Sequence, residues 1–565
     1  MTMSNIFSYV VPLIIMLGVL IFVHELGHFL VAKYFKVRVE VFSLGFGKKL
    51  VSFRRGDTEY CLSAIPLGGY VKMFGDDPSA EISEADRQAS FLHKPVGQRI
   101  AVVLAGPVMN LFFAFLLYTA ISMIGEKAIF PGLGDIEPKS AAATAGFKSG
   151  DTLLSINDST GATHKLATWT EVDKLVQTNA DSKLDFSVQR VNGNVETVSA
   201  VPKLIPNPNV LSLKKEVGGI EGLSFMSRAS TIAVGSMEGA AGKAGLRTGD
   251  TITKINATPL HRWRDLLMAV GTFADQPEIT VTVQRGLLES FMNEEKEPKT
   301  IDFKLTVPAA AKGKTGFAAL KAMGFDDPEL YLASVEKGSP AMKAGLLPGD
   351  LLTSIDGTSV AKFDEVMSKI RTFKGDKSLH FTVLRNEKPV EIDVIPNVKK
   401  RMNGSGQEES RFEVGIRPMI IDDNVQTVDL TTGNILEAME RGVVRSAETS
   451  AMVVMGLVRL IQGEVSSKNV GGFLSIGQMA KSSWGRGAAD FLFSMAMISI
   501  NLFILNLLPV PVLDGGHLIF YSIEAVRGAP LSMQKMEFAQ RIGAALLVGL
   551  MVFALFNDVS RIWFK

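Results

Sequence analysis

The sequence has only one cysteine, Cys61, among its 565 residues, and this scarcity excludes two kinds of architecture. A single thiol forms no internal disulfide framework, and it excludes a zinc site built from several cysteines. Excess charge is also missing, because 59 Lys and Arg residues balance 58 Asp and Glu residues to within a net charge of +1. This balance predicts that the protein has no nucleic-acid partner.

Basic residues are missing before the first apolar run, since MTMSNIFSYVVP contains neither Lys nor Arg. A cleaved secretory signal peptide has a positively charged stretch in this place. We therefore expect the apolar run over residues 9–32 to be retained in the protein. The mean hydropathy of the chain is +0.22, a value that indicates a lipid-bilayer part together with soluble parts.

Four segments are long and apolar enough to cross a bilayer, which takes about 20 residues. The predicted spans are residues 9–32, 101–125, 491–513 and 540–563. The loop between the first two spans is rich in Lys and Arg, which is typical of cytoplasmic loops. We expect residues 126 to 430 to lie on the other side of the membrane. Residues 8–125 and 489–565 then form an N-terminal and a C-terminal membrane region.

The cytoplasmic loop contains a hairpin pattern over residues 38–74. KLVSFRRGDTEYCLSAI has two strand-like runs around a Gly-Asp turn, and this arrangement predicts a β-hairpin. Because it is short and close to the spans, we expect this β-region to be associated with the membrane.

The extracytoplasmic part repeats itself, with Gly-Asp pairs at 150–151, 249–250 and 349–350. The period of about 100 residues is that of a domain. We predict three α+β domains over residues 127–205, 215–308 and 325–400, each with a short helix, a Gly-Asp turn, strands and a longer helix. The motif resembles PDZ domains of the bacterial, circularly permuted type. That resemblance implies peptide binding by strand addition, with residues 133–136, 231–235 and 331–335 as candidate groove strands. The alternative is three spacers with closed grooves.

Residues 427–485 follow the repeats and have helical periodicity. Their apolar stretch, residues 451–458, is too short to span a bilayer. The pattern favours an amphipathic, interfacial helix, and a buried core helix is the alternative.

The sequence HELGH lies inside the first predicted span. His24 and His28 are four residues apart and therefore share one face of a helix. Two imidazoles in this arrangement bind Zn²⁺ together, and Glu25 is placed to act as general base on a metal-bound water. A catalytic zinc site needs a third protein ligand, which has to come from another span.

The stretch NLLPVPVLDGGH, residues 506–517, offers that third ligand. Asp514 stands at the cytoplasmic end of the third predicted span, at the depth of His24 and His28. His517 is a rival ligand, and a helix cap is the structural alternative for Asp514. Pro509 and Pro511 interrupt helical hydrogen bonding and leave backbone polar groups unpaired. At this depth in the membrane, such groups occur only where they line a cavity or are buried in protein.

Four stretches resemble the bacterial site-2 protease family of the RseP type, which are intramembrane zinc metalloproteases: VHELGHFLVAKYFKVRVEVFSLGFGKKL, IPLGGYVKM, VGQRIAVVLAGPVMNLFFAF and NLFILNLLPVPVLDGGH. The resemblance implies His24, His28 and Asp514 as zinc ligands and Glu25 as the base. It also implies that Asn506 steadies the substrate or the oxyanion, and that the β-region holds the substrate as an added strand. Family members usually carry two PDZ domains, whereas this chain has three repeats.

The sequence therefore predicts a polytopic α-helical membrane protein of the bacterial inner membrane with a β-hairpin region and three extracytoplasmic PDZ-like domains. Its expected reaction is zinc-dependent hydrolysis of peptide bonds in transmembrane segments of single-span proteins, such as trimmed anti-sigma factors or remnant signal peptides. Its expected partners are these substrates, the lipid bilayer and peptide or protein ligands of the PDZ-like domains. The alternative is a membrane-tethered PDZ scaffold or chaperone with a non-hydrolytic metal site.

Overall fold

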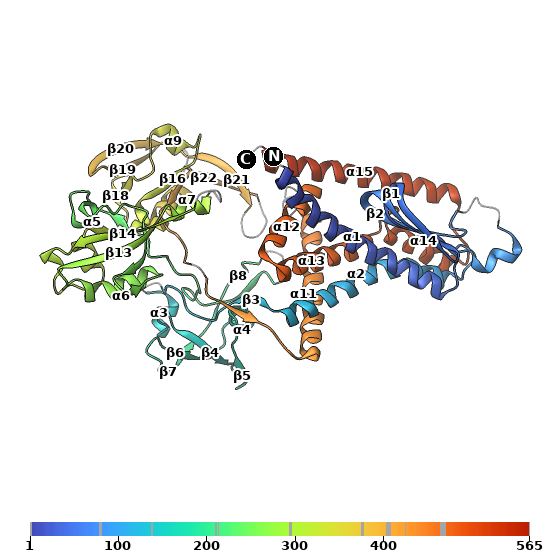
Figure 1. The fold of residues 1–565 in the computed structure, drawn as a ribbon, viewed down its shortest axis with the longest axis horizontal. Helices are drawn as coiled ribbons and strands as arrows, with labels where there is room; N and C mark the ends of the chain where they lie inside the picture. The colour runs from blue at the N-terminus through green and yellow to red at the C-terminus, as the bar shows by residue number, and fades with distance from the viewer. Residues whose placement is uncertain are drawn as a thin grey trace.

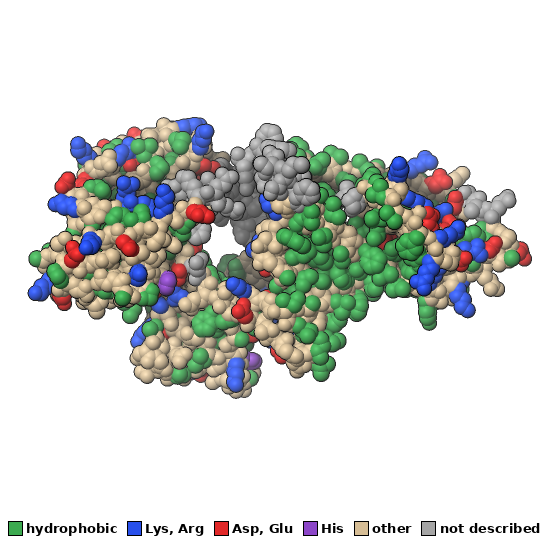
Figure 2. All heavy atoms as spheres, viewed as in Figure 1, with side chains coloured by type: hydrophobic (Ala, Val, Ile, Leu, Met, Phe, Trp, Pro, Cys, Tyr) green, Lys and Arg blue, Asp and Glu red, His purple; other side chains and the backbone are tan. Residues whose placement is uncertain are grey.

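A computed structural model describes residues 3–77, 82–136, 139–209, 212, 214–292, 297–373, 378–402, 408–423, 425–463 and 471–563. The molecule has a helical half and a β-rich half (Figure 1). The chain begins in the helical half, passes through the β-rich half and returns to the helices. Figure 2 shows apolar side chains covering much of the helical half, whereas charged side chains are spread over the β-rich half.

Among the described residues, four helices are long and apolar enough to cross a membrane, which confirms the expected number of spans. They are α1 (Met3–Tyr34), α2 (Val96–Ile124), α13 (Ala488–Asn506) and α15 (Met533–Trp563). The first three share one apolar core that includes Met16, Tyr118 and Ile500.

The third helix ends earlier than predicted. α13 stops at Asn506, and α14 (Asp514–Arg527) begins only after a seven-residue loop, residues 507–513. Pro509 and Pro511 in that loop have no backbone N–H to continue the ladder of helical hydrogen bonds. The predicted span over 491–513 is therefore wrong at its end, and Asp514 opens a helix of its own.

The predicted hairpin is present as β1 (Val39–Arg55) and β2 (Thr58–Met73). The strands fold back so that Val41–Leu44 pairs with residues 59–62 on one edge and with residues 69–72 on the other. Residues 69–73 thereby form an outer strand of this sheet, and it lies against α1. A Cβ added to Gly69 would lie 2.9 Å from Ile21 and 3.0 Å from the Glu25 side chain.

The predicted threefold repeat is present as three four-stranded antiparallel sheets with one strand order, β5-β4-β6-β7, β12-β11-β13-β14 and β18-β17-β19-β20. Each sheet is accompanied by a longer helix and by a short helix before the Gly-Asp turn. The strands are β4 (Thr152–Asn157), β5 (Thr163–Lys165), β6 (Leu184–Gln189), β7 (Val195–Ala200), β11 (Thr251–Ile255), β12 (Thr258–Pro259), β13 (Glu278–Arg285), β14 (Lys299–Thr306), β17 (Leu351–Ile355), β18 (Thr358–Ser359), β19 (Leu379–Arg385) and β20 (Lys388–Val394). The longer helices are α4 (Trp169–Thr178), α6 (Trp263–Phe273) and α10 (Phe363–Arg371), and the short ones are α3 (Ala141–Ala145), α5 (Ala240–Lys243) and α9 (Pro340–Ala344).

The repeated Gly-Asp aspartate has a structural role. In every repeat this carboxylate is 1% exposed and forms an ion pair of 2.5 to 2.7 Å with an arginine at the end of a strand. The pairs are Asp151–Arg190, Asp250–Arg285 and Asp350–Arg385. A buried charge of this kind is stable only when it is paired and hydrogen-bonded, so the repeated motif reflects folding of the turn.

The hydrophobic cores of the three repeats extend beyond the predicted C-terminal domain boundaries. The first core extends beyond residue 205 to Ile220 and Phe225, and the second extends beyond residue 308 to Phe325. The third extends beyond residue 400 to Val414. In each repeat a short extended segment that follows the predicted domain pairs with an interior strand, and such short segments carry little alternation for a sequence pattern to show.

The predicted groove strands are corrected as well. The backbone of residues 133–136 forms hydrogen bonds with that of Asp151 on one edge and with that of Ser224 on the other. Residues 231–235 lie between Asp250 and Phe325, and residues 331–335 lie between Asp350 and β23. All three strands are interior, so the outer strands are those that follow: residues 224–229, β15 (Phe325–Asp326) and β23 (Ile416–Pro418).

The remaining elements lie within these units or between them. They are η1 (Glu84–Ala89), β3 (Glu126–Ile129), β8 (Lys203–Pro206), β9 (Glu216–Gly219), β10 (Ala233–Val234), α7 (Leu287–Met292), η2 (Ala309–Ala311), α8 (Gly316–Ala322), η3 (Pro328–Leu330), β16 (Leu332–Val335), β21 (Asn397–Met402), β22 (Glu408–Glu413), β24 (Thr427–Leu430), α11 (Ile435–Ile461) and α12 (Phe473–Arg486). β24 pairs with β3 and leads the chain from the repeats back to the helices.

Helix α11 crosses the spanning helices (Figure 1) and packs on α2 and α13. Its inner face buries Ala438, Gly442 and Ser446. A neighbouring face exposes apolar side chains, among them Leu436 and Val443. One face of the helix therefore lies in the core and a second apolar face is exposed, and its interfacial position stays a prediction.

Candidate active site

His24 and His28 lie one turn apart on α1, inside the first apolar span. The two Nε2 atoms are 3.2 Å apart. The side chain of His24 is 14% exposed and that of His28 is 11% exposed. The i, i+4 spacing of the motif therefore places two imidazole nitrogens at one point inside the helical half, as predicted.

Asp514 reaches the same point from the start of α14. Its Oδ2 lies 3.2 Å from His24 Nε2 and 3.7 Å from His28 Nε2. Among the described residues, these three side chains form the one group able to hold a metal ion, and their ligand atoms all lie within 4.8 Å of one another. The rival candidate His517 is not part of this group, and its ring faces Phe520 and Tyr521 instead.

The two glycines after Asp514 allow this approach. A Cβ on Gly515 would lie 2.2 Å from the Leu508 carbonyl oxygen, and one on Gly516 would lie 2.4 Å from Pro511 Cα. Any side chain at these positions would push the first turn of α14 away from the loop before it. The DGG sequence therefore fits a turn that is tight enough to bring Asp514 to the histidines.

The donor set fits a divalent cation. His28 Nδ1 donates to the Val102 carbonyl oxygen at 2.9 Å, and in the neutral ring this leaves a lone pair on Nε2. That lone pair faces His24 Nε2 and the Asp514 carboxylate, an arrangement that is repulsive without a cation among them. In a tetrahedral site with bonds of about 2.0–2.2 Å, ligand atoms are about 3.3–3.6 Å apart, close to the 3.2 to 3.7 Å seen here.

Asn110 on α2 contacts the other ring nitrogen of His24. The amide side chain lies 3.2 Å from His24 Nδ1, and Asn110 Oδ1 is buried without a hydrogen-bond partner among the described residues. When Nε2 holds a metal, Nδ1 carries the ring proton, so its partner has to be an acceptor. The two ends of an amide are interchangeable in assignment, and the turned amide gives His24 Nδ1–H an oxygen to donate to.

We expect Asn110→Ala to lower zinc affinity by about 10- to 100-fold, as loss of an outer-shell partner of a histidine ligand does. Asn110→Asp, which keeps an acceptor at the same place, is expected to retain most of the affinity. Competition with a chromophoric chelator measures both constants. Equal affinities for wild type and Asn110→Ala would contradict a role for this amide.

Gly106 on α2 makes room for His28. A Cβ built there would lie 2.2 Å from His28 Nε2 and 2.6 Å from Cε1. Gly27 on α1 has a similar role, because its added Cβ would lie 2.4 Å from the Ala105 carbonyl oxygen. These two glycines allow α1 and α2 to approach closely beside the histidines.

Glu25 and Asn506 are the other predicted site residues. Glu25 follows His24 directly and lies next to Gly69 of the β2 edge. Asn506 ends α13, and its Nδ2 lies 3.5 Å from His24 Nε2. The structure therefore places a carboxylate and an amide beside the three converging donors.

An ion pair ties α14 to α2 near the site. The two guanidinium nitrogens of Arg99 lie 2.5 and 3.1 Å from the Glu524 carboxylate oxygens, and the guanidinium stacks on Tyr521 at 4.8 Å. Breaking such a buried pair costs about 3–5 kcal/mol. Neither this pair nor the contact of Asn110 could be predicted from the sequence, because their partners are distant in the chain.

The chain is similar to known metalloproteases over nearly its whole length. The model of the family described as Peptidase family M50 matches residues 12–550. A protein of Neisseria meningitidis named as a zinc metalloprotease is 32% identical, and the match covers 96% of this chain and 97% of that protein. Protease RseP of Yersinia pestis is 31% identical, with 99% and 100% covered. The regulator of sigma-E protease RseP of Escherichia coli is 30% identical, with 97% and 98% covered.

Proposed function

Because this chain belongs to peptidase family M50 and is a site-2 type metalloprotease, we propose that it hydrolyses peptide bonds within transmembrane segments of single-span membrane proteins. One observation carries the proposal: His24, His28 and Asp514 converge inside a bundle of helices that are apolar enough to span a bilayer. A site at that depth suits a bond that lies in the membrane itself. We propose zinc as the metal, with these three residues as its protein ligands.

The chemistry needs one acid-base group and one polarised carbonyl. A bound zinc ion supplies Lewis acidity and lowers the pKa of water. Glu25 takes the proton of the attacking water and returns it to the leaving amine. The Asn506 amide, at the end of α13, donates a hydrogen bond to the substrate carbonyl oxygen as negative charge develops on it.

A transmembrane helix has to unwind before its backbone reaches these groups, because helical hydrogen bonds occupy its carbonyls and amides. The outer strand 69–73 offers replacement partners beside Glu25. An extended substrate segment added to this edge keeps its backbone polar groups satisfied. We propose that the hairpin presents the substrate in this way.

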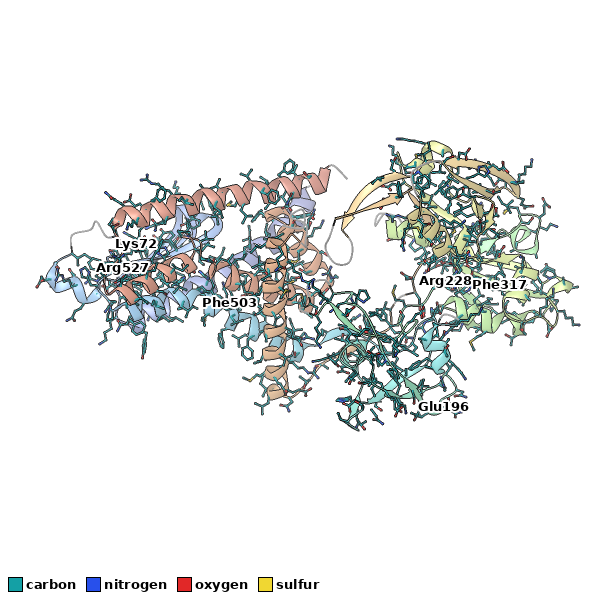
Figure 3. The ribbon with its side chains drawn as sticks, turned by 180° about the vertical axis from the view of Figure 1, so that it is seen from behind. Lys72, Glu196, Arg228, Phe317, Phe503 and Arg527 are labelled. Atoms are coloured by element: carbon teal, nitrogen blue, oxygen red, sulfur yellow. The ribbon has the colours of Figure 1, made fainter. Side chains whose placement is uncertain are left out.

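The proposed setting is a bacterial inner membrane, with the three PDZ-like repeats outside the cytoplasm and the active site near the cytoplasmic side. Basic side chains support this orientation, since Lys72 and Arg527 lie at the end of the helical half that is far from the repeats (Figure 3). The repeats would then admit single-span proteins whose outer part has already been trimmed, such as cleaved anti-sigma factors or signal-peptide remnants. Peptide or protein ligands of the repeats belong to the same proposal.

The test of this proposal is a comparison of membranes that contain the wild type or Glu25→Gln. We expect trimmed single-span proteins to accumulate with Glu25→Gln, because loss of a general base lowers the rate by about 10²–10⁴-fold. Quantitative proteomics of the membrane fraction, with peptides that end inside transmembrane segments, measures the change. Continued processing of a co-expressed single-span substrate by Glu25→Gln would instead indicate the scaffold or chaperone with a non-hydrolytic metal site.

A further inference from the structure

The extended segment 224–229, which leads from the first repeat into the second, is paired along both edges. On one edge, Gly134 N–H of the first repeat donates to the Ser224 carbonyl oxygen at 2.7 Å, and Trp263 N–H of the second repeat donates to the Arg228 carbonyl oxygen at 2.8 Å. On its other edge, Asp423 N–H donates to the Ser227 carbonyl oxygen at 2.7 Å, and Ala229 N–H donates to the Ile421 carbonyl oxygen at 2.8 Å. Residues 421–423, which follow the third repeat, therefore pair antiparallel with the segment that joins the first repeat to the second.

Side-chain contacts also hold residues 421–423 in this place. Arg262, at the start of α6 in the second repeat, donates from Nε to Asp423 Oδ2 at 2.9 Å, and the two side chains are 15% and 16% exposed. Ile421 is 5% exposed beside them. The added strand thus offers a buried apolar residue and, two positions later, a carboxylate that faces a guanidinium.

One polar group at the junction has no partner. Ser227 is 6% exposed, and its Oγ makes no hydrogen bond among the described residues. The hydroxyl lines a small cavity together with Arg262, Asp423, Val425 and Gln426. Figure 3 labels the neighbouring residue, Arg228, where the first repeat meets the second. A buried hydroxyl without a partner is costly, and it gives the edge a free donor for a ligand.

We propose that this edge, formed by Ser227–Ala229 and Arg262, is a recognition site for an extended peptide with an apolar residue two positions before an acidic one. The chain's own segment 421–423 occupies the site, and an external peptide of the same chemistry competes with it. The assignment concerns binding alone and does not depend on the proteolytic function. A tethered strand has an effective concentration in the millimolar range, so a free peptide binds well only after the tethered segment is released.

The experiment uses the full-length protein and a fluorescent peptide with the sequence of residues 418–428. Asp423→Lys places a cation beside Arg262 and is expected to release the tethered strand while leaving Arg262 and the edge intact. We expect the peptide to bind Asp423→Lys at least 10-fold more tightly than the wild type, by fluorescence anisotropy. Hydrogen exchange of residues 419–423 is expected to rise in the same variant.

Three controls test whether the effect depends on the ion pair between Arg262 and Asp423. Asp422→Lys makes the same charge change at the neighbouring, exposed position and is expected to behave as the wild type. Arg262→Glu combined with Asp423→Lys reverses the ion pair and is expected to restore protection and exclude the peptide, which also shows that the fold is kept. A peptide carrying Lys in place of its second Asp is expected not to bind. Equal peptide binding by the wild type and Asp423→Lys, or unchanged hydrogen exchange in Asp423→Lys, would overturn the proposal.

Discussion

Replacement of His24 by alanine or of Asp514 by asparagine is expected to remove zinc from the purified protein and to reduce cleavage to background. The reason lies in the donor geometry, because each of the three ligand atoms is within 3.7 Å of the others. A catalytic zinc site keeps three protein ligands, so losing one leaves two donors and two open positions. Elemental analysis of the zinc content per chain and cleavage of a reconstituted single-span substrate measure the two effects.

Glu25→Gln is the matched comparison for these variants. It changes the residue next to His24 but removes no ligand atom of the group, so its zinc content is expected to equal that of the wild type while cleavage is lost. His517→Ala is the second comparison, because His517 lies outside the ligand group and is expected to leave the metal in place. An unchanged zinc content in His24→Ala or Asp514→Asn would remove that residue from the ligand set.

Replacement of Gly106 by alanine is expected to disable the site through one added methyl group. The new Cβ would lie 2.2 Å from His28 Nε2, far inside van der Waals contact, so the ring or α2 must move. A displacement of about 1 Å at a reacting site costs about 100-fold in rate, and we expect a loss of at least that size together with weaker zinc binding. Overpacking also lowers the free energy of unfolding by about 1–3 kcal/mol.

Gly18→Ala on α1 is the control for this prediction. A Cβ at Gly18 has no atom within 4 Å, so the substitution adds the same methyl group to a spanning helix without displacing a neighbour. Wild-type zinc content and cleavage are expected for Gly18→Ala. Wild-type activity in Gly106→Ala would show that His28 is held less tightly by α2 than the structure indicates.

The spanning helices and the threefold repeat could be predicted because their signals are local. An apolar run of about 20 residues crosses a bilayer as a helix, and the predicted spans 9–32 and 101–125 overlap α1 and α2, although both helices begin earlier than predicted. The Gly-Asp motif recurs once per domain and marks the same turn in each repeat. The sequence did not show which arginines pair with the motif's aspartates, because these arginines are 35 to 39 residues away in the chain. It also did not show the last strand of each domain, because these strands are too short to carry a clear pattern.

The sequence by itself determined the reaction class of this protein, because HELGH fixes two imidazoles and a carboxylate on one helix by the 3.6-residue period. The sequence already favoured Asp514 over His517 as the third ligand, and the tertiary structure shows how it reaches the two histidines, through a loop that Gly515 and Gly516 allow to close tightly. The tertiary structure also decided that Asn110 faces His24 and that segment 421–423 pairs with the segment between the first and second repeats. The physical reason is that helical periodicity acts over one turn, whereas pairing across hundreds of residues depends on packing and backbone hydrogen bonds that exist only in the folded chain.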